Sequence, residues 1–294
     1  MLNLVRGGLQ AELDHFFHAV LERDDPRQAT KSAFSQARLK LKPEALRTLL
    51  QHFASHVRQA VQVPRWHGLR VLAADGSTVR MPGLGNLREH FGGMNTSCGK
   101  FRTLGRFVSL FDVATQVSFD AVLGPYHADE RSLVVKLLDQ VAADDLLLLD
   151  RGFPSFGLFN ELARRNIPFC ARIDPTRWNE AKAFVQSGRH DHVATFTPSR
   201  AVADKFRLRG STPSALTLRL IRHMLPNGEQ LVLVTSVLNT AIANAVHFAI
   251  SGDQSCRRLR GSSPLRGRCC LVRRLTRRGL DRPLGLVRRP SATA

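Results

Sequence analysis

The chain has 294 residues, 43% of them hydrophobic, which is enough to bury one large core together with a small accessory domain. No apolar run approaches the roughly 20 residues of a membrane-spanning helix, and the charged N-terminal stretch is unlike a secretory signal, so we expect a cytoplasmic protein without a membrane partner. The net charge of +19 favours a polyanion such as nucleic acid as the partner.

Residues 1–63 show the pattern of a small helical domain. Apolar residues recur at helical spacing over residues 9–21, and "KSAFSQARLKL" predicts a second helix with Ser32 as a candidate cap. A third helix is predicted to begin at Pro43, because proline suits the first turn of a helix. The domain could bind DNA, and its basic residues are the place to look for contacts.

Three basic residues, Arg38, Lys40 and Lys42, lie close together near the junction between the second and third predicted helices. They could contact the phosphate groups of DNA, as lysine and arginine commonly do. They could also form an ordinary solvated face, because charge runs usually lie on exposed surfaces. The sequence leaves both interpretations open.

A different pattern begins after residue 65. The segment "LRVLAAD" predicts a buried strand that ends at Asp75, and the glycine-rich, polar residues 83–100 predict a loop. Alternation on both sides of "ATQ" in "GRFVSLFDVATQVSFDAVLGP" predicts a β-hairpin. "DERSLVVKLLDQVA" predicts an amphipathic helix that Asp129 can cap.

The next segments predict a βαβ unit. "DLLLLD" is short and wholly apolar, which fits a strand covered on both faces, and "PSFGLFNELARRN" and "IPFCARI" follow as a helix and a second strand. The pattern weakens over residues 174–213 and returns as two strands joined by Asn227-Gly228, a strong hairpin signal. The order of elements predicts an α/β fold with a mixed sheet flanked by helices.

Two aspartates occupy equivalent positions in this pattern. Asp75 and Asp150 each directly follow an apolar strand and precede a glycine-containing turn. If the two strands are neighbours, their carboxyl ends bring both carboxylates to one edge of the sheet. Carboxylates that lie close together repel, so a shared divalent cation, Mg²⁺ or Mn²⁺, is the natural ligand. The alternative is that each aspartate only begins a turn or caps the next helix.

Five segments stand in an order that is typical of one enzyme family. "KSAFSQARLKLKPEAL" comes first, followed by "LAADGSTVRMP", "LLLLDRGFPSFGLF", "IPFCARI" and "LVLVTSVLN". Over about residues 30–240 the chain therefore resembles the DDE transposases of the insertion sequence four family. The most specific parts of this resemblance are D-G-[ST] and D-R-G at the two strand ends.

The resemblance implies a ribonuclease-H-like core within residues 66–249, with a β-rich insertion at about residues 176–232. It implies that Asp75 and Asp150 are the first two metal-binding acids, with Mg²⁺ or Mn²⁺ ions that activate water or a DNA 3′-hydroxyl for attack on a phosphodiester. The implied partner is double-stranded DNA of transposon terminal repeats, bound by a homodimer. Arg151, beside the second acid, could face a phosphate group or pair with a surface acid.

The third acid of the family is missing from its expected place. The family carries a glutamate, within a tyrosine–arginine–glutamate–lysine signature, shortly after the strand that "LVLVTSVLN" resembles. Here the last glutamate is Glu229, the single tyrosine is Tyr126 and the last lysine is Lys205. In its place stands an Arg-rich tail, residues 250–294, without Glu, Lys, Tyr, Trp or Phe.

This tail admits two interpretations. Residues 251–294 carry 12 Arg and 2 Asp, a net charge of +10 out of the +19 of the whole chain, and no helical or strand period holds along them. We interpret the tail as a disordered, out-of-frame reading after a frameshift near residues 241–251. The rival interpretation is an evolved basic tail that binds DNA.

These observations predict a cut-and-paste DNA transposase that is catalytically defective, because members of a catalytic set act as a unit. The alternative is a non-catalytic DNA-binding remnant that competes with an intact copy for the terminal repeats. A third option is a metal-dependent nuclease on the same core, with Asp112 or Glu229 as its further acid.

Overall fold

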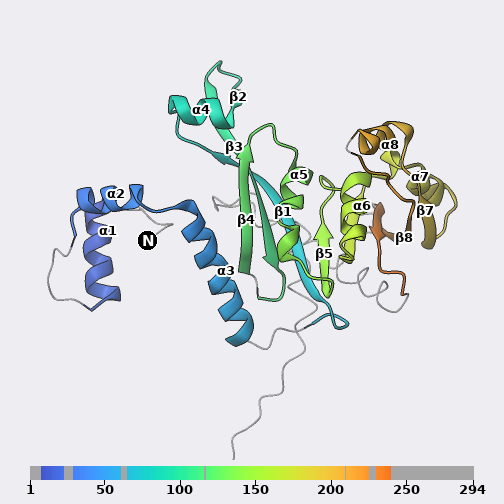
Figure 1. Cartoon of the computed structure of the whole chain (residues 1–294), viewed down its shortest axis with the longest axis horizontal. Coiled ribbons are helices and arrows are strands. Elements are labelled where there is room, and N and C mark those ends of the chain that lie inside the picture. Colours follow the sequence, from blue (N-terminus) through green and yellow to red (C-terminus); the bar gives the residue numbers. More distant parts are fainter. Residues whose placement is uncertain are drawn as a thin grey trace, which may run out of the picture. The chain divides into compact units, whose positions relative to one another are not determined.

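The computed structural model describes residues 8–22, 29–60, 65–115, 117–208, 210–224 and 230–239. The chain forms two compact units, Met1–Leu49 and Leu50–Ala294 (Figure 1). The division falls within helix α3 (Pro43–Ala60), so the helical region predicted from the sequence contributes to both units. The Arg-rich tail, residues 250–294, lies outside the described residues.

The helices of the N-terminal region lie where the sequence predicts them. Helix α1 (Leu9–His15) continues into a π-helical turn, η1 (Phe16–Val20), and α2 spans Lys31–Leu39. Helix α3 begins at Pro43, as predicted. The cap of α2 is Thr30 and not Ser32, because Thr30 has the extended backbone of a cap position and its side chain accepts a hydrogen bond from the Ala33 N–H.

Nine strands among the described residues form a single mixed sheet in the order β2-β3-β1-β5-β6-β9-β8-β7, with β4 paired to β3. Strand β1 pairs antiparallel with β3 and parallel with β5, and β6 continues the parallel part. The strands are β1 (Arg70–Arg80), β2 (Gly93–Asn95), β3 (Phe101–Asp112), β4 (Val117–Pro125), β5 (Asp145–Leu149), β6 (Phe169–Ile173), β7 (Asp191–Phe196), β8 (Leu216–Met224) and β9 (Gln230–Thr235).

This topology confirms the predicted fold class. An antiparallel meander, β4-β3-β1, joined to parallel β5 and β6 is the arrangement of a ribonuclease-H-like sheet. The remaining helical elements of this unit are α4 (Gly85–Phe91), α5 (Glu130–Val135), η2 (Leu138–Gln140), α6 (Phe156–Arg164), η3 (Pro175–Arg177), α7 (Asn179–Gln186) and α8 (Arg200–Arg207). Among the described residues, none of the helices is both long and apolar enough to cross a bilayer.

The structure confirms the hairpin of β3 and β4, the βαβ unit of β5, α6 and β6, and the antiparallel pairing of β8 with β9. The Asn227-Gly228 turn lies outside the described residues. The predicted helix over residues 129–142 is shorter than expected, since α5 ends at Val135 and the separate turn η2 follows. Asp129 caps α5, as predicted, by accepting a hydrogen bond from the Arg131 N–H.

Two further expectations are wrong. Strand β1 does not end at Asp75, because β3 continues to pair with it as far as Arg80. Residues 83–100 are not a loop throughout, since α4 and β2 lie there. The guanidinium of Arg88 in α4 lies 4.0 Å from the centre of the Phe101 ring at the start of β3. This contact joins residues that are 13 positions apart, so the pattern of neighbouring residues cannot reveal it.

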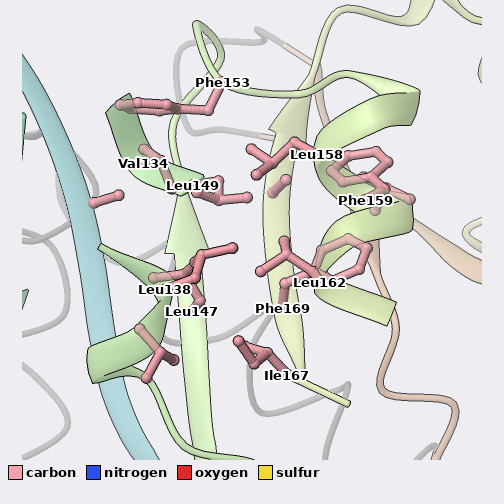
Figure 2. Close-up of a cluster of buried hydrophobic side chains, with 14 of the residues drawn as sticks. Val134, Leu138, Leu147, Leu149, Phe153, Leu158, Phe159, Leu162, Ile167 and Phe169 are labelled. Atoms are coloured by element: carbon pink, nitrogen blue, oxygen red, sulfur yellow. The ribbon is translucent and has the colours of Figure 1, made fainter. Parts of the chain in front are cut away.

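The core of the sheet is packed on both faces. All five residues of β5 are buried, which confirms the prediction of a strand covered on both sides. Leu147 and Leu149 belong to the cluster that includes α5 and α6, whereas Leu146 and Leu148 belong to a second cluster without helical residues. Figure 2 shows the α6 side chains meeting those of β5 and β6: Leu158, Phe159 and Leu162 against Leu147, Leu149 and Phe169. Complete burial of each such leucine side chain stabilises the folded state by roughly 1.5–3 kcal/mol.

Candidate active site

The register of β1 and β5 brings the two predicted aspartates to one edge of the sheet. The last pair of residues in this parallel ladder is Ala74 with Leu149. Asp75, within β1, and Asp150, directly after β5, are the next residues, so they follow side by side where the pairing of the two strands ends. Strands β1 and β5 are therefore neighbours, as the prediction of a shared site requires.

The two aspartates are held differently. Asp75 stays in regular structure, because β1 continues beyond it and the antiparallel ladder pairs it with Ser109. Asp150 lies in a turn, in which its carbonyl accepts the Phe153 N–H at 3.0 Å and its Oδ1 accepts the Arg151 N–H at 2.7 Å. Both side chains are half-buried. A hard cation could therefore reach oxygen ligands from two neighbouring strands.

Arg151 pairs with an acid at the end of the next strand. Its Nη2 donates to Oδ2 of Asp174 at 3.0 Å, and Asp174 directly follows β6. Of the two interpretations of Arg151, the structure shows the pairing with a surface acid. Hydrogen bonds from the Thr176 hydroxyl and from Arg151 hold the pKa of Asp174 at about 2, so this carboxylate is charged at neutral pH.

A glutamate that sequence reasoning treated only as part of a helix also lies at this edge. The carboxylate of Glu130, the first residue of α5, packs against Gly76 and Gly152. It forms an ion pair with Arg106 of β3, with 2.9 Å between Nη1 and Oε1. In the sequence, the sign of this contact is the glycine that closely follows each aspartate. Glu130, which lies against both glycines, is distant from them in the chain.

Of the two alternative third acids, the structure describes Asp112, which is not brought to this edge. Asp112 lies opposite Leu72, three residues before Asp75, and its Oδ1 accepts the backbone N–H groups of Ala114 and Thr115 to close the β3–β4 turn. Glu229 lies outside the described residues. In the part of the chain that the structure describes, no three His, Cys, Asp or Glu side chains are grouped to hold a metal ion. A metal at this edge would rest on the two aspartates.

The three candidate DNA contacts of the N-terminal unit are exposed. Arg38 lies in the last turn of α2, Lys40 is its C-terminal cap, and Lys42 directly precedes α3. The guanidinium of Arg38 also lies 5.9 Å from the centre of the Phe34 ring. Their position at a junction of two helices agrees with the sequence pattern, and exposure is compatible both with phosphate contacts and with a solvated face.

Comparison with known proteins adds a family. Residues 66–218, more than half of the chain, match the family model described as "Transposase DDE domain". The chain is 30% identical over 127 residues to the putative transposase InsZ of Escherichia coli K12, which covers 42% of each chain. It is 26% identical over 193 residues to the transposase InsG for insertion sequence element IS4 of the same organism, covering 65% of this chain and 43% of InsG. The chain thus spans less than half the length of these curated relatives.

Among solved structures, the chain is similar to the piggyBac transposase in a synaptic complex with hairpin DNA. The sequence identity is 13% and the TM-score is 0.40, over 81% of this chain and 49% of that one. A weaker likeness, with a TM-score of 0.27 and 10% identity, is to Endonuclease V of Ciona intestinalis in complex with DNA, over 71% of this chain and 90% of that one.

Proposed function

The chain belongs to the transposase DDE domain family, of the insertion sequence four type, and on this premise we propose that it is by descent a cut-and-paste DNA transposase with its site at Asp75 and Asp150. The observation that carries the proposal is the parallel register of β1 and β5, which supports it because Asp75 and Asp150 directly follow the last paired residues, Ala74 and Leu149. The proposed reaction is metal-dependent hydrolysis of phosphodiester bonds at the ends of an element, followed by strand transfer.

The two aspartates suit Mg²⁺ or Mn²⁺, because both ions prefer carboxylate oxygens. When bound, such ions stabilise charge on the phosphate and make water or a 3′-hydroxyl a better nucleophile. The protein's own part is to hold the two acids on packed strands. Asp75 is fixed by the ladder with β3, and Asp150 by the turn that Phe153 closes.

The proposed partner is the double-stranded DNA of the element's terminal repeats, engaged by a homodimer. The net charge of +19 supports attraction to a polyanion. The exposed residues Arg38, Lys40 and Lys42 are the candidate contacts of the N-terminal unit.

We further propose that a chain of these 294 residues is catalytically defective. No glutamate follows Glu229, whereas the family's third acid is a glutamate in a signature after the strand that β9 represents. Removing one member of a set that acts together removes most of the catalysis. Translation of the other two reading frames from about codon 240 tests the cause. A Tyr-Arg-Glu-Lys signature in a shifted frame would support a frameshift, and its absence would favour an evolved tail.

The activity test is cleavage and joining of DNA that carries the terminal repeats flanking the gene, with Mg²⁺ or Mn²⁺. We expect specific binding of the repeats and strand transfer near background. Efficient strand transfer by this chain would refute the defect. Absence of any binding that distinguishes the repeats from other DNA would refute the transposase proposal itself.

The second candidate function is a non-catalytic DNA-binding remnant that competes for the repeats. In the sequence, the basic residues of the N-terminal unit are separate from the two aspartates. This separation favours a DNA-binding function that does not depend on the catalytic acids. Binding to the repeats should be compared with and without residues 251–294 in a salt titration. If specific binding needs the tail, this candidate fails, because the tail's contribution should be electrostatic and independent of sequence.

A further inference from the structure

The carboxylate of Glu130 occupies the space that a side chain at Gly76 would need, and it also lies within contact distance of Gly152. A Cβ atom built on Gly76 would lie 2.9 Å from Cδ of Glu130 and 3.0 and 3.1 Å from its two oxygens, and one built on Gly152 would lie 3.5 Å from Oε2. Neither glycine has a positive φ, so backbone conformation does not require glycine at these positions. The close approach of Glu130 favours glycine at position 76, whereas the distance at Gly152 is that of an ordinary contact.

These glycines are the neighbours of the two acids. Gly76 directly follows Asp75, and Gly152 is the second residue after Asp150. One side chain therefore lies against the residue directly after Asp75 and against the second residue after Asp150. Movement of that side chain would change the position of one acid relative to the other.

Arg106 fixes the position of Glu130. Its Nη1 donates to Oε1 of Glu130 at 2.9 Å and to Oγ1 of Thr78 at 3.3 Å, and its Nη2 donates to the carbonyl of Tyr126 at 3.4 Å. Arg106 is itself the ladder partner of Thr78, two residues beyond Gly76. The side chains of both members of the ion pair are about one quarter exposed, which limits their freedom.

Arg131, the residue after Glu130, also connects the start of α5 to the turn at Asp150. Nε of Arg131 donates to the carbonyl of Phe153 at 3.1 Å, and the Phe153 N–H closes the turn at Asp150. Helix α5 is anchored in the core through Leu133 and Val134, both of which are buried. The start of α5 thus contacts the strand after Asp75 and the turn after Asp150 at once.

We propose that Glu130 is a positioning residue that sets the separation of Asp75 and Asp150 and so the affinity of this edge for a divalent cation. The inference rests on the proposed function of the two aspartates. Repulsion would drive two carboxylates apart, and functional groups must be held within about 0.5 Å of their working geometry. The ion pair with Arg106 neutralises Glu130, so this third carboxylate adds little repulsion of its own.

The charge of Glu130 should affect the affinity for a cation separately from the space that its side chain fills. If Glu130 becomes neutral, the positive charge of Arg106, which lies opposite Thr78 in the ladder of β1 and β3, is no longer compensated, and this should oppose the binding of a cation at Asp75 and Asp150. Glu130→Gln, which preserves shape, should therefore weaken Mn²⁺ binding by about tenfold, at the low end of the effect of residues that support metal ligands. Glu161→Gln is the matched control, because it also breaks glutamate–arginine pairs but on α6, and it should leave Mn²⁺ affinity unchanged.

The decisive test is a cycle of variants of the full chain, with Mn²⁺ binding followed by electron paramagnetic resonance and stability followed by thermal unfolding. Gly76→Ala should lower both Mn²⁺ affinity and Tm, because the new methyl group meets the Glu130 carboxylate. The double variant Gly76→Ala/Glu130→Ala should recover Tm, since the clash is gone, but not Mn²⁺ affinity. Recovery of both, or unchanged affinity in Glu130→Gln, would show that Glu130 only fills space and would overturn the inference.

Asp75→Asn separates this inference from the proposed function. If the unsubstituted chain shows no Mn²⁺ binding that depends on Asp75, the proposed function fails. Hydrogen exchange of the segments 75–78 and 150–153 then decides the positioning role. Faster exchange of both segments in Glu130→Ala would sustain it, and unchanged exchange would overturn it.

Discussion

The two ends of the β1–β5 pair carry opposite arrangements of charge. At the amino end, Arg70 and Asp145 face each other in the ladder, both buried, and the guanidinium donates to both carboxylate oxygens at 2.7 Å. Five residues further along, at the carboxyl end of the β1–β5 pairing, Asp75 within β1 and Asp150 directly after β5 place two acids next to each other. The same pair of strands therefore holds a neutralised ion pair and a pair of like charges.

This difference separates a structural role at the amino end from the functional role proposed for Asp75 and Asp150. A buried and fully hydrogen-bonded ion pair has no capacity for a ligand, and its loss on one side leaves an uncompensated charge. Two half-buried carboxylates on adjacent strands repel each other where they lie close together, and they offer oxygen atoms to a cation. Substitutions at the two ends should accordingly have opposite effects on stability.

The largest effect is expected at the amino end. Asp145→Asn leaves the buried guanidinium of Arg70 without its partner and should reduce the free energy of unfolding by about 3–5 kcal/mol, measured by urea denaturation. The double variant Arg70→Met/Asp145→Leu removes both charges and should recover most of this loss. A loss below about 1 kcal/mol in Asp145→Asn would contradict the structural role of the pair.

The carboxyl end should show the reverse. Asp150→Asn keeps the oxygen that accepts the Arg151 N–H but removes one like charge, so without metal it should raise the free energy of unfolding by about 0.5–1 kcal/mol. Unfolding in EDTA measures this change, and Mn²⁺ affinity should fall at least about tenfold in the same variant. If Asp150→Asn destabilises the metal-free chain instead, the acid has a structural role like that of Asp145.

The positions of the two acids could be predicted because they depend on a local signal. An apolar run such as residues 146–149 predicts a buried strand, and an acid directly after it marks the strand's end. The same reasoning placed the end of β1 at Asp75, although the strand runs on to Arg80. Polar and glycine residues hid the continuation, which exists because β3 is long enough to pair with it.

The contacts that surround the acids could not be predicted, because they join residues that are distant in the chain. Glu130, Arg106 and Asp174 each meet the site through the order of strands or through a helix packed on them. The short helix α4, which lacks a side-chain cap, likewise gave no local signal. Local patterns predicted the strands and the two proposed ligands, whereas the supporting contacts required the fold.

The ion pairs of Glu161 with Arg164 and Arg165 are partly exposed. They are therefore an intermediate case between the buried pair of Arg70 and Asp145 and the two acids Asp75 and Asp150. Hydrogen bonds from Arg164 and then Arg165 hold the pKa of Glu161 at about 2, below its usual 4.5. The unfolded chain therefore binds this proton more readily, so the stabilisation is fully present above pH 4.5 and is lost as the pH falls towards 2.

Glu161→Gln should cost about 1 kcal/mol at pH 7, since solvent screens a pair in which Arg164 is 66% exposed. Urea denaturation of the variant and of the unsubstituted chain at pH 7 and pH 3 measures the difference. The difference should shrink at the lower pH. An equal difference at both values would mean that packing, not charge, is the contribution of Glu161.

The smallest effect on stability is expected for Arg151, whose pair with Asp174 is exposed on the arginine side. Arg151→Ala should change the free energy of unfolding by no more than about 1 kcal/mol. Arg151→Ala is informative when it is compared with Asp174→Asn, because the second variant disrupts the same pair but leaves the arginine in place.

DNA binding as a function of salt distinguishes the two roles of Arg151. If the arginine also contacts phosphate, Arg151→Ala should weaken binding and reduce the salt slope by about 1, whereas Asp174→Asn, which removes a negative charge, should strengthen binding. If the arginine serves only the surface pair, its removal should leave the salt slope unchanged. The proposed contact of this site with DNA would then not include the neighbouring guanidinium.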